Sequence, residues 1–146
     1  MSELRISIGS DNLYPVAVAL YEELKKRGFE VRAYGSLVTG RFESWPDVAF
    51  SVANDVAEGR SDFGIIICYT GTGVTIAANK VRGVRAALCF DAETAKGARL
   101  WNDANVLTIS GRLTTPQVGK EILEAWLSVM GPDPSEIDNI KKIMDK

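Results

Sequence analysis

The sequence contains no histidine. Histidine is the side chain whose ordinary pKa lies closest to neutral pH, so acid–base chemistry in this protein depends on Cys, Asp, Glu, Lys or Tyr. A zinc site is also not expected, because the chain has no histidine and its two cysteines, Cys68 and Cys89, lie far apart in the sequence. The glycine-rich turn at residues 69–73 matches neither the P-loop nor the dinucleotide-binding pattern. We therefore expect neither a metal nor a cofactor.

Long apolar runs and an excess of basic charge are also absent. No run approaches the roughly 20 apolar residues that cross a membrane. The formal net charge is −2, whereas nucleic-acid-binding domains usually carry a basic excess. The first residues lead directly into a strand-like pattern instead of a secretory signal. We expect a cytoplasmic protein with two reduced thiols that binds neither membranes nor nucleic acid.

The sequence does contain a regular alternation of strand-like and helix-like segments. Short apolar runs predict five strands, at residues 4–8, 29–34, 63–68, 84–89 and 105–109. Amphipathic segments predict helices at residues 13–27, 46–58, 74–80, 92–100 and 116–130, with a polar loop at residues 35–45. Pro132 and Pro134 separate the helix predicted at residues 116–130 from a last helix, which has Ile137, Ile140 and Met144 on one face.

This alternation is typical of a parallel sheet with helices on both faces. With 146 residues, the chain has the usual length of one domain. We predict a single α/β domain over residues 1–146, a Rossmann-like three-layer sandwich with a five-stranded parallel sheet and a C-terminal tail helix. We expect the tail, residues 130–146, to pack on a partner subunit.

Ligands of such sheets bind outside the carboxyl ends of the strands, which draws attention to Cys68. Cys68 ends the most apolar strand and leads into the glycine turn, after which a helix begins. The turn amides and the helix start favour an anion there, and they would lower the pKa of the thiol. Cys68 is then a candidate base next to an oxyanion hole. The alternative is a small core residue, which is the interpretation that we favour for Cys89.

Other polar and aromatic side chains near the predicted strand ends have two interpretations each. Asp11 and Asn12 follow the first strand and either contact a ligand or cap the next helix. Asn102 lies in a segment that has the composition of a turn. Arg112 follows the last strand and is either an anion clamp or a surface residue. Three aromatic residues are candidates for pocket walls or for plain packing: Trp45, Tyr69 and Trp101.

Residues 68–80 read Cys-Tyr-Thr-Gly-Thr-Gly-Val-Thr-Ile-Ala-Ala-Asn-Lys. This segment resembles the ribose-5-phosphate isomerase B and galactose-6-phosphate isomerase family, whose pattern is Cys-Gly-Thr-Gly-x-Gly followed by Ser-Ile-Ala-Ala-Asn-Lys. Shorter similar stretches extend the resemblance, in order, from about residue 4 to residue 128. They lie at residues 9–11, 45–47, 83–89, 102–107 and 111–112.

The resemblance implies an aldose–ketose isomerase that forms an enediolate. Cys68 matches the family base, and Thr70 with the turn amides matches the group that binds the oxyanion. Further residues match substrate contacts or lie beside them: Asp11, Asn12, Tyr69, Gly71, Thr72, Gly73, Trp101, Asn102 and Arg112. The resemblance also implies a homodimer or homotetramer with sites at the subunit interface.

Four departures from the family pattern concern the substrate. Trp101 stands where the family has its ring-opening histidine, and Asn12 replaces a second histidine. Tyr69 replaces a glycine beside the base, and residues 131–136 lack the arginines that clamp the substrate phosphate. We therefore expect an open-chain or non-phosphorylated sugar or sugar acid as substrate.

Two alternatives remain open from the sequence. One is a ribose-5-phosphate or related sugar-phosphate isomerase whose phosphate site was rebuilt around Arg41, Arg99 or Arg112. The other is a non-catalytic sugar-binding protein or partner subunit.

Overall fold

The computed structural model describes residues 3–144 and 146, and its centre is a parallel sheet with the strand order β2-β1-β3-β5-β4. The strands are β1 (Arg5–Ser10), β2 (Glu30–Gly35), β3 (Phe63–Cys68), β4 (Ala86–Leu88) and β5 (Val106–Ser110). The helices are α1 (Pro15–Lys26), α2 (Ser36–Thr39), α3 (Trp45–Ala57), α4 (Thr72–Ala78), α5 (Ala92–Asn102), α6 (Pro116–Ser128) and α7 (Ile137–Met144), and a 3-10 turn, η1 (Pro134–Glu136), precedes α7. The predicted α/β sandwich is confirmed.

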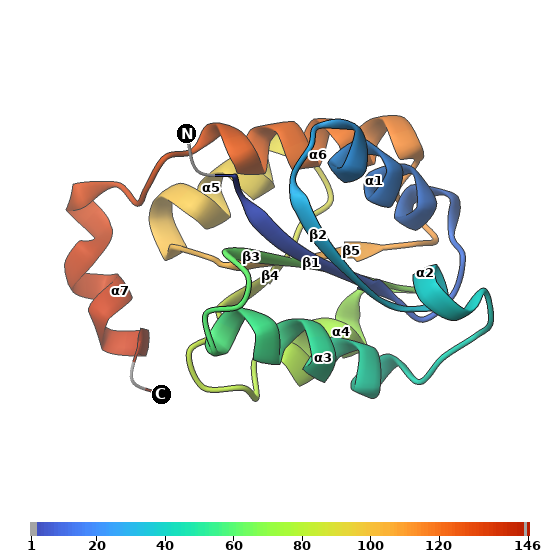
Figure 1. Ribbon diagram of the computed structural model, residues 1–146. Helices are drawn as coiled ribbons and strands as arrows, with labels where there is room; N and C mark the ends of the chain where they lie inside the picture. The colour runs from blue at the N-terminus through green and yellow to red at the C-terminus, as the bar shows by residue number, and fades with distance from the viewer. Residues whose placement is uncertain (1–2, 145) are drawn as a thin grey trace.

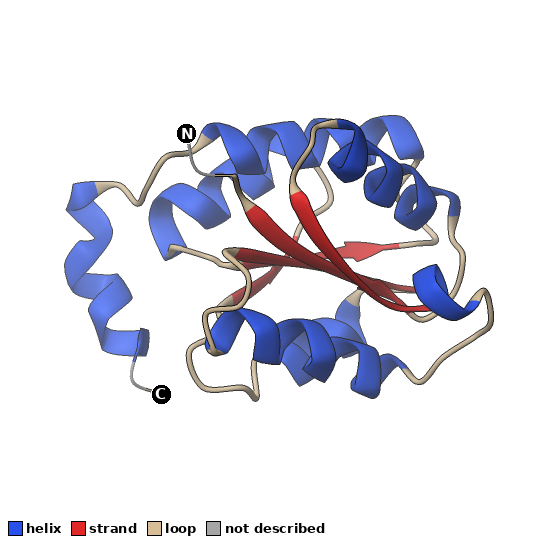
Figure 2. Ribbon diagram, in the orientation of Figure 1, coloured by secondary structure: helices blue, strands red, loops and turns tan. Residues whose placement is uncertain are grey.

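The helices form two layers around the sheet. Helices α1, α5 and α6 cover one face, and α3 and α4 cover the other (Figures 1 and 2). Strand β3 is the central strand of the sheet, between β1 and β5, and helices cover both of its faces. Ile65 and Ile67 pack under the first layer of helices, while Ile66 packs under α3 and α4. The unbroken apolar run of β3 is what a strand covered on both faces requires.

Two segments differ from the sequence-based prediction. The predicted loop at residues 35–45 contains the short helix α2, which is bounded by Gly35 and Gly40, both at positive φ. The predicted strand at residues 84–89 shortens to Ala86–Leu88, because β4 lies at the edge of the sheet and pairs with β5 alone. Neither difference changes the order of the elements.

The tail helix α7 stands apart from the two layers (Figure 1). Of its side chains only Ile140 is buried, while Ile143 and Met144 are half exposed. An amphipathic helix with so little of its apolar face covered fits the predicted contact with a partner subunit. That contact stays a prediction.

A polar cluster around the buried Asp55, in the last turn of α3, joins this helix to β1 and β2. The Asp55 carboxylate accepts hydrogen bonds from Ser7 Oγ (2.7 Å), Tyr34 Oη (2.6 Å) and Arg60 Nε (2.7 Å). Burial alone raises the pKa of Asp55, but these hydrogen bonds outweigh it and hold the pKa below its usual range. The cluster fastens α3 to the sheet.

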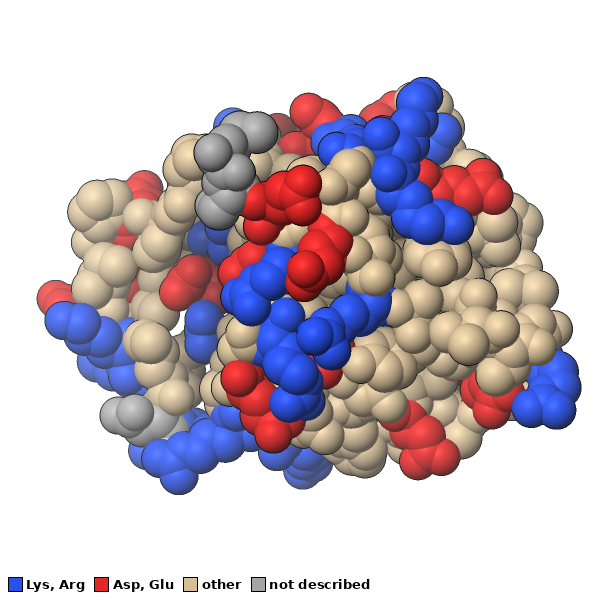
Figure 3. Space-filling view, in the orientation of Figure 1, with Lys and Arg blue, Asp and Glu red and all other residues tan. Residues whose placement is uncertain are grey.

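Charged side chains of both signs lie side by side on the face shown in Figure 3. Ion pairs account for part of this pattern, for example Arg5–Asp62 (3.0 Å) and Arg60–Glu58 (2.8 Å). Among residues 3–144 and 146, no helix has the length and apolar character needed to cross a bilayer.

Candidate active site

A cavity of about 300 Å³ opens at the carboxyl ends of β1 and β3. It is lined by Asp11, Trp45, Cys68, Tyr69, Thr70, Thr72 and Gly73. Strands β1 and β3 are neighbours, and the amide of Asp11 donates a hydrogen bond to the carbonyl of Ile67 (3.3 Å). The pairing of these strands therefore brings Asp11 beside Cys68, although 56 positions separate them in the sequence.

The turn after Cys68 is hydrogen-bonded to the segment that follows β5. The carbonyl of Cys68 accepts a hydrogen bond from the amide of Gly111 (2.8 Å), and that of Tyr69 accepts one from the amide of Arg112 (3.0 Å). Gly71 has a φ of +80°, and a Cβ there would lie 2.6 Å from Leu88 Cδ1 and 3.0 Å from the backbone of Ile109. Only glycine fits this position, since it has no Cβ and adopts positive φ readily.

Cys68 lies at the cavity with 5% of its surface exposed. Thr70 and Thr72 are exposed beside it, and their hydroxyls are 2.7 Å apart. The thiol thus has hydroxyl groups and a carboxylate as neighbours in one small cavity. Cys89 is fully buried instead, and burial, with a smaller effect of Asp91, raises its pKa to about 12. This environment suits the expected role of Cys89 as a core residue.

Asp11 does not cap a helix. Tyr14 occupies the N-cap position of α1, and no side chain caps that helix. The Asp11 carboxylate instead accepts a hydrogen bond from Tyr14 Oη (2.9 Å) and faces the cavity with 4% of the residue exposed. Burial raises the pKa of Asp11, while the Tyr14 hydrogen bond opposes this effect. The capping alternative for Asp11 is wrong.

The cavity beside Cys68 is lined by two aromatic side chains, Trp45 and Tyr69, and Tyr14 lies next to it through its hydrogen bond to Asp11. Trp45 begins α3 and lies over Gly73, where a Cβ would come within 3.1 Å of its ring. Trp45 is thus a wall of the cavity, one of the two interpretations left open by the sequence. Tyr14 was missed, because its position before a proline at the start of a helix carries no chemical signature.

Some predicted site residues lie outside this cavity. Asn12 is exposed, and its Oδ1 accepts a hydrogen bond from the amide of Leu13 (2.9 Å). Gly71 is buried against β5. Arg112 lies at the rim, with its guanidinium carbon 5.8 Å from the centroid of the Tyr69 ring.

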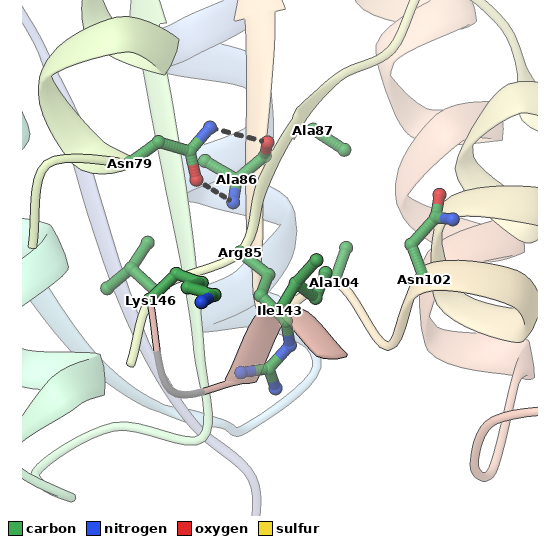
Figure 4. A pocket seen from close by; sticks show the side chains of 9 residues that line it. Asn79, Arg85, Ala86, Ala87, Asn102, Ala104, Ile143 and Lys146 are labelled. Carbon is green, nitrogen blue, oxygen red and sulfur yellow. Dashed lines mark hydrogen bonds between the residues drawn. The ribbon is translucent and has the colours of Figure 1, made fainter. Parts of the chain in front are cut away.

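Trp101 and Asn102 lie toward the amino ends of the strands, at the other end of the sheet from Cys68. Helix α5 begins near the carboxyl end of β4 and runs back for 11 residues, or about 16 Å at 1.5 Å per residue. Asn102 lines a different cavity, of about 380 Å³, between β4 and α7 (Figure 4). Asn79 at that cavity pairs its amide with the backbone of Ala86 (2.8 and 3.0 Å). Trp101 is 55% exposed.

The three arginines suggested as alternative phosphate ligands differ in exposure and in their distance from the cavity. Arg99 is buried, donates to the carbonyls of Ala104 (3.2 Å) and Val129 (3.1 Å), and lies over the Phe63 ring at 4.4 Å. The suggestion that Arg99 could bind a phosphate is therefore wrong. Arg41 has a 79% exposed side chain, 3.8 Å from Glu43. Arg112 is the one of the three whose guanidinium lies over a side chain of the cavity wall.

Comparison with known proteins shows the family. The model of the ribose/galactose isomerase family matches residues 6–143. The chain belongs to this family. The predicted family and the predicted class of enzyme, an aldose–ketose isomerase, are confirmed.

Relatives within the ribose/galactose isomerase family cover nearly the whole chain. D-erythrulose-4-phosphate isomerase of Pectobacterium atrosepticum is 36% identical over 141 residues, 96% of this chain and 93% of its own length. Ribose-5-phosphate isomerase B of Escherichia coli is 38% identical over 124 residues, 84% of this chain and 83% of its own. The structure of Clostridium thermocellum ribose-5-phosphate isomerase B matches with a TM-score of 0.90 and 37% identity, over 97% of this chain and 95% of that one.

Proposed function

We propose that this isomerase acts through an enediolate, with the thiolate of Cys68 as the base. The thiolate removes a proton from the carbon beside the substrate carbonyl, and the electron pair of that C–H bond forms the C=C bond as the carbonyl oxygen becomes an oxyanion. Thr70 and the amides of the turn stabilise the oxyanion. A proton passes from the neighbouring substrate hydroxyl to this oxyanion. The thiol then returns its proton to the former carbonyl carbon, the C=C electron pair forms that C–H bond, and the neighbouring oxygen forms the new C=O bond, which yields the isomeric sugar. The observation that supports this assignment is the cavity shared by Cys68, Asp11 and Thr70.

We further propose that the substrate reacts as an open-chain sugar of about four carbons. Ring opening needs an acid near the ring oxygen, and Trp101 stands where the family has the histidine that supplies this acid. A four-carbon sugar phosphorylated at its last hydroxyl cannot close a five-membered ring, so it needs no such acid. The small cavity, narrowed by Trp45 and Tyr69, suits a short substrate. The relative from Pectobacterium atrosepticum is named for D-erythrulose 4-phosphate, a sugar of this kind.

Arg112 is the cation that we assign to the anionic end of the substrate. Its position over the Tyr69 ring lets the guanidinium reach a phosphate or carboxylate at the rim of the cavity. A free sugar or a sugar acid remains the alternative to a sugar phosphate.

NMR of deuterium uptake from heavy water tests this function. The protein is incubated with D-erythrulose 4-phosphate, free erythrulose, a keto-uronate and ribose 5-phosphate. We expect deuterium beside the carbonyl of the four-carbon phosphate, at turnover rates within about 1–1,000 per second, the usual range for enzymes. Faster turnover of ribose 5-phosphate would contradict the open-chain proposal. No uptake from any compound would contradict the isomerase mechanism.

We also propose that two copies of the chain complete each site. Trp101 is half exposed and lies at the other end of the sheet from Cys68. It can therefore reach the Cys68 cavity only of another copy of the chain. Trp101→Ala and Cys68→Ala are each expected to have little activity. When the two variants are refolded together, mixed dimers hold one intact site, and about a quarter of the parent activity should return. No recovery, in a sample shown by sedimentation to be dimeric, would contradict shared sites.

A further inference from the structure

Tyr14 lies next to the active site although it belongs to no pattern found in the sequence. Its carbonyl accepts the first hydrogen bonds of α1, from the amides of Ala17 (3.0 Å) and Val18 (3.2 Å). Its side chain serves a different purpose, because the hydroxyl donates to Asp11 Oδ1 at 2.9 Å. The start of α1 thus carries a donor to a carboxylate that lines the cavity with Cys68.

The ring of Tyr14 is held in place by the segment after β5 and by Tyr69. A Cβ at Gly111 would lie 2.5 Å from Tyr14 Cγ, so the ring needs a glycine at this point. The ring centroids of Tyr14 and Tyr69 are 6.5 Å apart with an angle of 40° between the planes. The amide of Gly111 donates a hydrogen bond to the carbonyl of Cys68. The backbone at Gly111 therefore contacts both the Tyr14 ring and the residue proposed as the base.

Burial and the neighbouring Asp11 carboxylate raise the pKa of Tyr14 and so favour the protonated form of its hydroxyl. Burial raises the pKa of Tyr14 strongly, the hydrogen bond and charge of Asp11 raise it further, and Cys68 and Tyr69 add smaller effects. Other groups near the pair are Arg112, which lies over Tyr69, and Glu43, whose amide donates to the carbonyl of Asp11 (2.9 Å). The Tyr14 hydroxyl is therefore a permanent donor, and its hydrogen bond favours the ionised form of Asp11.

We propose that Tyr14 is a positioning residue of the active site, which holds the Asp11 carboxylate ionised and oriented toward the substrate beside Cys68. A buried carboxylate beside a thiolate tends to take up a proton, and a protonated Asp11 could no longer accept a substrate hydroxyl. The hydrogen bond from Tyr14 opposes this proton uptake in a protein that has no imidazole. The part of this proposal that concerns the substrate rests on the proposed function, whereas the effect on Asp11 does not.

Tyr14→Phe tests the proposal, because it keeps the ring over Gly111 and removes only the hydroxyl. We expect the carboxyl carbon of Asp11, followed by 13C NMR and assigned with Asp11→Asn, to titrate at a higher pH than in the parent protein. We expect kcat/KM to fall about 10- to 100-fold, as for a lost hydrogen bond to a charged group, mainly through kcat. The acidic limb of the pH–rate profile should move to higher pH with the carboxyl titration.

Tyr21→Phe is the matched control, since Tyr21 lies on the same helix and its ring contacts Lys25. It should change neither the carboxyl titration nor the pH–rate profile. An Asp11 titration in Tyr14→Phe that coincides with the parent would overturn the proposal. So would a variant that loses only thermal stability and keeps the parent pH–rate profile. If the parent turns over no sugar, the proposed function fails, and the carboxyl titration still decides whether Tyr14 controls Asp11.

Discussion

Cys68→Ala is expected to lower isomerisation about 1,000-fold or more while the fold remains intact, because the variant has no group to remove the proton beside the carbonyl. Only the sulfur atom is lost, at a cavity wall that already contacts solvent, so the unfolding free energy should change little. A coupled assay of sugar isomerisation and the deuterium uptake described above both measure the loss.

Cys89→Ala provides the control for this substitution. Cys89 is the other thiol of the chain, fully buried, with its pKa raised by burial to about 12. Its replacement should cost stability through the cavity that it leaves, and turnover of the folded fraction should remain at the parent level. If Cys68→Ala retained turnover within about tenfold of the parent, Cys68 would not be the base, since a general base contributes at least about 100-fold.

Asp55→Ala is expected to lower the free energy of unfolding by about 1–3 kcal/mol, the cost of leaving a buried polar group without its partner. The variant removes the acceptor that Ser7, Tyr34 and Arg60 share. Ser61 still pairs with Ser7 and Glu58 with Arg60, so Tyr34 loses most. Urea denaturation at neutral pH, followed by the fluorescence of the tryptophans, measures the free energy of unfolding. A loss below about 1 kcal/mol, the size of a surface effect, would show that the cluster does not hold α3 to the sheet.

The pH dependence of this loss has a definite sign. The hydrogen bonds hold the pKa of Asp55 below its usual range in the folded protein. The stabilisation is therefore fully present above the ordinary value of about 3.9 and is lost as the pH falls through the folded pKa. The difference between parent and Asp55→Ala should shrink in acid. Asp62→Ala, which removes a carboxylate that is 37% exposed, should cost about 1 kcal/mol or less at neutral pH.

The order of strands and helices was predictable because each element has a clear local pattern. The run from Phe63 to Cys68 is apolar throughout, and the segment from Pro116 carries the 3.6-residue period of a half-buried helix. Helix α2 was missed because four residues are too few to show a period. Its ends depend on Gly35 and Gly40, whose positive φ values do not show in the composition.

The site was predictable only where it follows from strand ends. Asp11 follows β1 and Cys68 ends the neighbouring strand β3, so chain order alone placed both at the carboxyl ends of the strands. Tyr14 is in the site because its side chain turns from a helix start onto Gly111, and only tertiary packing determines this direction. The resemblance makes Trp101 a candidate substrate contact, and the length of α5 places it far from Cys68 of the same chain, toward the amino ends of the strands.

The central position of β3 has a consequence during synthesis on the ribosome. Strand β3 pairs with β1, which is made before it, and with β5, which begins about 40 residues later, at Val106. Until β5 has left the ribosome, one edge of β3 with its isoleucines has no partner, and such an edge invites pairing with other nascent chains. The hydrogen bonds that hold the turn after Cys68 also come from Gly111 and Arg112. A growing chain therefore passes through an aggregation-prone stage, and the step that ends it also assembles the catalytic turn.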